Sequence, residues 1–223
     1  MSDPPRFLPI FHDQTVGEVC SKFGHIFRRP GGVYLSLKHK GRLHEVLSHW
    51  VEKDVRVICI TSGERILGLG HLGANGMGIP IGKLQLYTAC DTVPPQYPLP
   101  RHMDFRTNNQ ELLTDPLYLG LRQARVSTAE RGELVDEFVQ TVQEVCPWCC
   151  IHFEDWAGVD AERLLKRYRE KVSCYDNDIQ GTAGVALAGI LNAARPTNLV
   201  PWSRIGRYWH CRPDCIGDDA RMA

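Results

Sequence analysis

The chain has 223 residues, and its 26 Lys and Arg residues are balanced by 26 Asp and Glu residues, so the formal net charge is zero. This length allows one large domain or two small ones, and the charge balance makes nucleic acid and anionic membranes poor candidate partners. No apolar run approaches the length of a membrane span, and the N-terminus has no apolar signal core, so we expect a cytosolic protein.

Taken in chain order, apolar periodicity in the first half predicts two helices and two strands. The capping-box spacing of Thr15-Val-Gly-Glu18 predicts a helix that begins with Thr15 as its cap. The later segments are a short strand over 33–37, an amphipathic helix over 43–50 and a buried central strand over 55–60.

The second half continues the alternation of helices and strands. Its predicted elements are a helix over 134–145 stopped by Pro147, a strand over 150–153, a helix over 160–168 capped by Asp160, a short segment over 172–175, and a helix over 181–194. The last helix is small and apolar, so we expect it to pack closely against a sheet or another helix and to end at Arg195-Pro196. Residues 1–194 therefore read as one α/β domain, with a predominantly parallel sheet flanked by helices.

Residues 195–223 show neither a helical nor a strand period. We interpret them as an irregular tail: a linker, a disordered end, or sequence translated from a shifted reading frame.

Nine cysteines are scattered along the chain, and most are expected to be reduced and buried. Cys146-Pro-Trp-Cys149 has the spacing of a redox or zinc pair, and Cys211 and Cys215 could nominally complete a zinc site with His210. The second half lacks a matching ligand spacing, so the structural interpretation is favoured.

The stretch Gly68-Leu-Gly70-His-Leu-Gly73 matches the G-x-G-x-x-G pattern and follows a predicted strand. Gly76, Gly78 and Pro80 fall where the helix of a dinucleotide-binding fold should run, so we expect no helix N-terminus for the phosphates. The pattern favours a glycine-rich loop beside a small substrate over a nucleotide site.

Three carboxylates follow predicted strands. Glu154 and Asp155 come at the end of one strand, and Asp178 follows the next short segment. The carboxyl ends of parallel strands share one edge of a sheet, so these side chains could converge on Mg²⁺ or Mn²⁺. Equally, Asp178 could only cap the helix after it while the other two face solvent.

Two basic residues are candidates for substrate chemistry. Lys83 lies in the apolar stretch 79–86, where a lysine can have a depressed pKa and serve as a base, although a surface lysine with a buried stem is the commoner case. Arg65 could hold a substrate carboxylate or pair with residues near Glu64.

Segments from about residue 9 to residue 194 resemble the malic enzyme family, in the family's order. They are Thr15-Val-Gly-Glu18, Lys22-Phe-Gly-His-Ile-Phe-Arg-Arg-Pro30, Gly63-Glu-Arg-Ile-Leu-Gly-Leu-Gly70, Gly76-Met-Gly-Ile-Pro-Ile-Gly-Lys-Leu84, Leu86-Tyr-Thr-Ala-Cys90, Thr107-Asn-Asn109, Asp115-Pro-Leu-Tyr-Leu-Gly-Leu-Arg122, Phe153-Glu-Asp155 and Asp178-Ile-Gln-Gly-Thr-Ala183. The resemblance implies the fold of the family's N-terminal domain. It also implies oxidative decarboxylation of malate to pyruvate and CO₂ with NAD⁺ or NADP⁺ and Mg²⁺ or Mn²⁺, in a chain that assembles as a dimer or tetramer.

The resemblance also implies roles for the candidate residues. Glu154, Asp155 and Asp178 match the family's metal ligands. Lys83 matches the base that takes the C2 hydroxyl proton, and Arg65 matches the arginine that holds a malate carboxylate. The metal interpretation of the three carboxylates is therefore favoured over capping.

Four positions depart from the family's pattern. His12 stands at the position of the family's tyrosine acid, and Asn177 stands at that of an aspartate. His71 replaces an aspartate and Arg106 a glycine. If residue 106 needs a positive φ, the arginine costs about 1 kcal/mol or more.

The tail contains no strand and Gly-rich turn of the kind that opens the family's nucleotide domain. We therefore expect the second, Rossmann-type NAD(P) domain to be missing and the chain to be cut at both ends. Three hypotheses remain open: a malic enzyme chain, a non-catalytic remnant that binds a divalent metal and a dicarboxylate, and a nucleotide-independent oxaloacetate decarboxylase.

Overall fold

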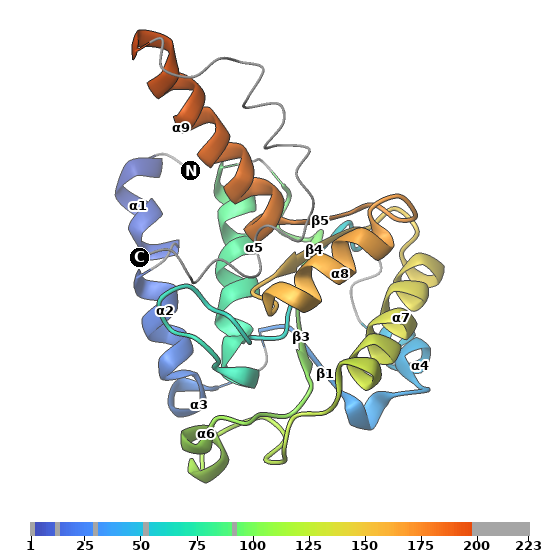
Figure 1. Ribbon diagram of the computed structural model, residues 1–223. Coiled ribbons are helices and arrows are strands. Elements are labelled where there is room, and N and C mark those ends of the chain that lie inside the picture. Colours follow the sequence, from blue (N-terminus) through green and yellow to red (C-terminus); the bar gives the residue numbers. More distant parts are fainter. Residues whose placement is uncertain (1–2, 12–13, 29–30, 51–53, 91–92, 198–223) are drawn as a thin grey trace.

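A single five-stranded sheet organises the fold in the computed structural model, which describes residues 3–11, 14–28, 31–50, 54–90 and 93–197. All the strand pairs are parallel, and the strand order is β1-β3-β2-β4-β5 (Figure 1). The strands are β1 Val33–Ser36, β2 Val57–Thr61, β3 Pro98–Asp104, β4 Cys150–Glu154 and β5 Cys174–Asp176. The predicted parallel α/β architecture is confirmed.

The strand β2 is the buried central strand that the apolar run at 55–60 predicts. Ile58, Cys59 and Ile60 are fully buried, because helices cover both faces of the sheet. By contrast, β3 was not predicted, although it lies between β1 and β2. Its sequence Pro98-Leu-Pro-Arg-His contains two prolines and two polar residues, which hide both the alternation and the apolar run of a strand.

One face of the sheet is covered by three helices, with the main apolar core between them and the strands. These helices are α4 Leu43–Ser48, α7 Thr128–Val145 and α8 Gly158–Tyr168. The helix α7 begins before its first core residue, Leu134, because Ser127 caps it. The Ser127 hydroxyl accepts a hydrogen bond from the Glu130 amide, and the Glu130 carboxylate accepts one from the Ser127 amide.

The helix α5, Gly78–Cys90, packs against β2 and β3 on the other face, and α1, Pro4–Phe11, and α2, Gln14–Ser21, pack against α5 (Figure 1). The expectation that no helix follows the glycine run was therefore wrong. Pro80 lies in the first turn of α5, where a missing amide hydrogen breaks no helical hydrogen bond. The remaining short helical segments are α3 Phe23–Ile26, η1 Leu37–His39, η2 Gly73–Met77 and α6 Gln110–Thr114.

Two residues that the sequence predicts as helix caps do not cap a helix, because their side chains bond to groups elsewhere in the fold. Thr15 lies inside α2, and its hydroxyl donates a hydrogen bond to the Pro9 carbonyl over 3.0 Å. Asp160 lies in the first turn of α8, after the N-cap residue Ala157. Its carboxylate lies 2.7 Å from Arg131 Nη2 in a buried ion pair, so it serves packing between α7 and α8 rather than capping.

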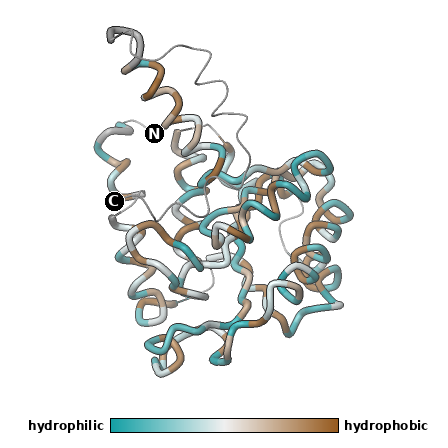
Figure 2. The backbone as a smooth tube through the Cα atoms, viewed as in Figure 1, coloured by the Kyte–Doolittle hydropathy of each residue, from teal (hydrophilic) through white to brown (hydrophobic). Residues whose placement is uncertain are grey.

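The last described elements are the π-helical turn η3, Asn177–Gly181, and α9, Thr182–Thr197. The helix α9 continues past the predicted end at Ala194 to Thr197. It projects from the rest of the fold, and Figure 2 shows hydrophobic residues along it. Val185 is 76% exposed and Ile190 52% exposed, so the predicted close packing of these side chains was wrong.

The cysteines and the helix lengths bear on two further expectations. The cysteines of the described segments are free thiols, and Cys59 and Cys149 are fully buried. Cys211, Cys215 and His210 lie outside the described residues. Within those residues, no helix combines the length and the apolar character that crossing a bilayer requires.

Candidate active site at the carboxyl ends of the parallel strands

The three predicted carboxylates meet where β4 and β5 end. Glu154 is the last residue of β4 and Asp155 follows it, while Asp178 lies in η3 directly after β5. Because β4 and β5 are parallel neighbours, the backbone amide of Asp155 reaches Asp178 and donates a hydrogen bond to its Oδ2 over 2.8 Å. The predicted convergence of Asp155 and Asp178 is confirmed.

The capping alternative for these residues is wrong. Asp176, not Asp178, caps η3, because its Oδ1 accepts a hydrogen bond from the Ile179 amide. Glu154 and Asp155 do not face solvent either: they are only 4% and 6% exposed. The sequence hides this difference because both Asp176 and Asp178 are spaced to cap the same helix.

Lys83 approaches this edge from α5. Its Nζ lies 2.7 Å from Glu154 Oε1, and the two side chains are 16% and 6% exposed. Lys83 is therefore not a surface lysine. Burial alone lowers the pKa of Lys83, but attraction and a hydrogen bond from Glu154, with help from Cys59 and Asp178, outweigh it and raise the pKa. The depressed pKa expected from the apolar sequence is absent because that sequence does not show Glu154.

The site carries more negative than positive charge. Burial, followed by the carboxylates of Asp178 and Glu154, raises the pKa of Asp155 to about 8. The pKa of Asp178 is also raised, by burial and by Glu154. The pKa of Glu154 is lowered despite its burial, because His152 and Lys83 stabilise its carboxylate. Asp155 also has a φ of 54°, a strained conformation for a residue with a side chain.

A group of aromatic residues behind Glu154 was missed at the sequence level. His152 stacks on Tyr175 with ring centroids 4.4 Å apart, and its Nδ1 lies 2.9 Å from the Tyr87 hydroxyl. The Tyr87 and Tyr175 hydroxyls are 2.6 Å apart. His152 Nε2 lies 2.5 Å from Glu154 Oε2. The two atoms are in close contact, but they do not have the geometry of a hydrogen bond.

A periodic signal for this group was present in the sequence. Tyr87 follows Lys83 by one helical turn on α5, and His152 shares a strand face with Glu154 on β4. Tyr87 therefore had to lie near Lys83, and His152 near Glu154. Tyr175 had no such signal, because its place depends on how β5 pairs with β4.

The loop after β2 places Arg65 at the same edge. The Asp155 carbonyl accepts hydrogen bonds from the Glu64 and Arg65 amides, over 3.2 and 3.3 Å. The Glu64 carboxylate pairs with Arg125. Among the described residues the exposed Arg65 guanidinium forms no ion pair, so it is available to an anion that enters this edge.

The remaining predicted residues are Asn177, His12 and the glycine-rich stretch, and the structure describes two of these three. Asn177 begins η3 beside Asp178, and its Oδ1 lies where a side chain on Gly181 would stand, so a glycine is needed there. His12 lies outside the described residues. The glycine-rich stretch folds back, with the Leu72 and Gly73 amides donating to the Gly63 carbonyl; its role beside a substrate stays a prediction.

The carboxylates suit a hard divalent cation by donor type and by charge. As they lie, however, no group of three or more His, Cys, Asp or Glu side chains in the described part of the chain is arranged to hold a metal ion. Glu154 Oε1 contacts Lys83, and Asp178 Oδ2 accepts from the Asp155 amide. Holding a cation would therefore require these side chains to turn away from their present partners.

Fold and site together define a parallel α/β domain in which a lysine, an arginine and several carboxylates gather where adjacent strands end. The sequence model for the malic enzyme N-terminal domain matches residues 1–169. The chain therefore belongs to the malic enzyme family.

Curated relatives agree with this assignment. The chain is 50% identical over 198 residues to an NADP-dependent malic enzyme of Sus scrofa, covering 88% of this chain and 36% of the relative. It is also 50% identical over 194 residues to NADP-dependent malic enzyme 1 of Arabidopsis thaliana, covering 86% and 33%. The chain thus spans about a third of the length of these relatives. A crystal structure of Entamoeba histolytica malic enzyme matches with a TM-score of 0.43 at 21% identity, over 83% of this chain and 37% of that one.

Proposed function

We propose that this chain binds malate together with Mg²⁺ or Mn²⁺ and takes part in oxidative decarboxylation of malate to pyruvate and CO₂, with NADP⁺ as the hydride acceptor. The observation that supports this best is the contact of Lys83 with Glu154 beside the Asp155–Asp178 hydrogen bond. These contacts gather a proton-transfer group and the carboxylates at one strand edge. Both relatives are NADP-dependent malic enzymes, which supports NADP⁺ over NAD⁺.

In the proposed reaction Arg65 holds a malate carboxylate, since its guanidinium is exposed and forms a planar fork that matches one. Lys83 would take the proton of the C2 hydroxyl in its unprotonated form, which requires Glu154 to turn away from it, since the contact with Glu154 raises the Lys83 pKa. The burial of Lys83 keeps water away from this transfer, and the hydrogen-bonded aromatic group behind Glu154 limits the movement of that edge.

Glu154, Asp155 and Asp178 would hold the divalent cation. When bound, the cation would supply positive charge that acidifies the alcohol and stabilises the negative charge left by loss of CO₂.

Two further residues complete the proposal. His12, at the position of the family's tyrosine acid, would return a proton to the carbon that loses CO₂, because histidine exchanges protons near neutral pH. Asn177 adds a polar but uncharged group beside Asp178. A cytosolic location and assembly of identical chains stay predictions.

The test uses the full chain with L-malate, Mn²⁺ and NADP⁺. It measures NADPH by absorbance, Mn²⁺ binding by electron paramagnetic resonance, and malate binding by isothermal titration calorimetry with and without Mn²⁺. NADPH formation that requires all three components would support the whole proposal. Malate binding that requires Mn²⁺ but forms no NADPH would limit the function to binding. Malate binding that is indifferent to Mn²⁺ would contradict the proposal.

A parallel assay separates the lyase alternative. Pyruvate release from oxaloacetate with Mn²⁺ but without nucleotide, in the absence of NADPH formation from malate, would favour a decarboxylase. Arg65→Gln is the matched variant for both assays. It should raise the KM for the acid at least tenfold, because it removes the charge that pairs with a substrate carboxylate.

A further inference from the structure

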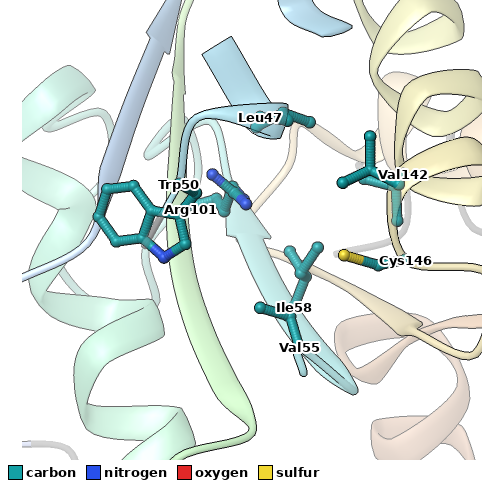
Figure 3. Close-up of a pocket in the computed structure, with 8 residues that line it drawn as sticks. Leu47, Trp50, Val55, Ile58, Arg101, Val142 and Cys146 are labelled. Carbon is teal, nitrogen blue, oxygen red and sulfur yellow. The ribbon is translucent and has the colours of Figure 1, made fainter. Parts of the chain in front are cut away.

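A cavity that is separate from the candidate active site lies on the face of the sheet that α4 and α7 cover. Its volume is about 160 Å³, and it lies between α4, β2, β3 and the end of α7 (Figure 3). Most of its walls are apolar and include Leu47, Ile58 and Val142. Trp50 and Cys146 also line it and are only partly buried, so a small molecule can enter beside them.

Three buried side-chain nitrogens of Arg101 and Trp50 at this cavity are hydrogen-bond donors that have no acceptor in the part of the chain that the structure describes. Arg101 is 2% exposed, and within the described residues its Nε and Nη1 have no hydrogen-bond partner and its guanidinium forms no ion pair. The Trp50 Nε1 is likewise buried without a partner. The Arg101 guanidinium lies 5.9 Å from the Trp50 ring centroid, and Figure 3 shows it among the cavity residues.

This combination is unfavourable without a ligand. Burial lowers the pKa of Arg101 to about 10, so the guanidinium stays charged at neutral pH. A buried charge with unsatisfied donors is one of the costlier features that a protein core can contain. Because all the unsatisfied atoms are donors, the group that would satisfy them is an acceptor with negative charge.

We propose that this cavity binds a small organic monocarboxylate with a compact apolar body. Its oxygens accept hydrogen bonds from Arg101 and Trp50, and its body contacts Leu47, Ile58 and Val142. An apolar cavity of about 150 Å³ accommodates benzene, so the ligand has roughly six to nine non-hydrogen atoms. Malate does not suit the cavity, because its hydroxyl and second carboxylate would face apolar walls.

The first experiment compares benzoate with benzamide on the full chain, by thermal unfolding and by isothermal titration calorimetry. Both molecules share a ring, but only benzoate carries a charge. At 10 mM, benzoate with a dissociation constant of about 1 mM should raise Tm by about 3–6 °C, and benzamide by less than about 1 °C. Equal shifts from the two molecules would overturn the proposal. An equal shift from inorganic phosphate would also overturn it, since it would mean an inorganic anion only.

Two variants locate the binding. Arg101→Leu should weaken benzoate binding at least tenfold, since it removes the charged donor, whereas Arg167→Leu, at an exposed arginine, should leave it unchanged. Trp50→Phe keeps an aromatic ring without the donor and should weaken binding several-fold. If Arg101→Leu fails to fold, Trp50→Phe still tests binding at this cavity. Benzoate binding that is unchanged in every folded variant at these two positions would overturn the assignment to this cavity.

Discussion

Asp178 accepts a hydrogen bond from the backbone amide of Asp155, over 2.8 Å, across the ends of the parallel strands β4 and β5. The bond joins two acidic residues that are distant in sequence, and Asp155 has a φ of 54°. Burial raises the pKa of both carboxyl groups, and nearby negative charge adds to it: that of Asp178 and Glu154 for Asp155, and that of Glu154 for Asp178. This edge is therefore arranged to favour a positive ligand.

Asp178→Asn separates the structural role of this side chain from its charge. The amide oxygen can still accept from Asp155, so we expect Tm to change by less than about 2 °C. Mn²⁺ binding should weaken at least about tenfold, because a charged donor is lost. Calorimetric titration with Mn²⁺ and thermal unfolding measure the two effects. Glu170→Gln, at an exposed carboxylate, is the control. Unchanged Mn²⁺ affinity in Asp178→Asn would argue against a metal role for this residue.

Lys83→Met should destabilise the fold. It leaves the Glu154 carboxylate buried without its lysine partner, and breaking a buried pair from one side costs about 3 kcal/mol. Urea unfolding measures the change in the free energy of unfolding.

The double variant Lys83→Met/Glu154→Gln tests the cause of that loss. It should recover at least about 1 kcal/mol relative to the sum of the two single changes, because neither charge is then left alone. Additive losses would mean that Lys83 and Glu154 are not energetically coupled.

Arg106→Gly should stabilise the chain by about 1 kcal/mol. Arg106 has a φ of 68°, which a glycine adopts without strain, and its buried Nε has no hydrogen-bond partner among the described residues. The amide that donates to Asp104 Oδ1 remains in the variant. Urea unfolding should show a higher midpoint for Arg106→Gly, whereas Arg42→Gly, at a φ of −137°, should show no gain. A lower midpoint for Arg106→Gly would mean that the arginine side chain contributes more through packing than its backbone costs.

Stability should fall as pH drops from about 6.5 to about 4, in part because of His71. Burial, with the nearby charges of Arg125 and His102, lowers the pKa of His71 to about 4, although Asp104 opposes this. An unfolded histidine titrates near 6.5, so between these values the unfolded state binds more protons and gains free energy relative to the fold. Above 6.5 both states are neutral and the contribution to stability is complete.

His71→Gln tests this assignment. The variant should show a shallower loss of unfolding free energy between pH 6.5 and 4 than the parent chain, measured by urea unfolding at three or more pH values. His44→Gln, at an exposed histidine, should follow the parent. Part of the slope should persist in His71→Gln, because burial also lowers the pKa of His102. Identical slopes for the parent and His71→Gln would remove His71 as a cause.

Much of the fold follows from patterns within single segments. The apolar run that contains Ile58 and Ile60 indicates a buried strand, and Leu43 with Leu47 indicates one face of a helix, because these periods do not depend on distant residues. The position of Glu154 and Asp155 at a strand end was readable for the same reason. The strand β3 was not, since its prolines interrupt every local pattern.

The site was predictable only to the level of which residues share an edge. Parallel strands place Asp155 and Asp178 together, as the sequence implied. The sequence could not show whether Lys83 meets Glu154, because an apolar neighbourhood fits both a low and a high pKa. The resemblance to malic enzymes named the residues, but it did not provide their charge states.

By itself, then, the sequence determined the alternation of strands and helices, the family, and the strand ends at which Glu154, Asp155 and Asp178 lie. Periodicity and motif order carry these properties, and both are local along the chain. Only the tertiary structure decided that Asp160 binds Arg131 instead of capping α8, and that Arg101 is buried beside Trp50 without an acceptor. These outcomes depend on contacts between segments far apart in sequence, where burial and neighbouring charge together determine what each side chain does.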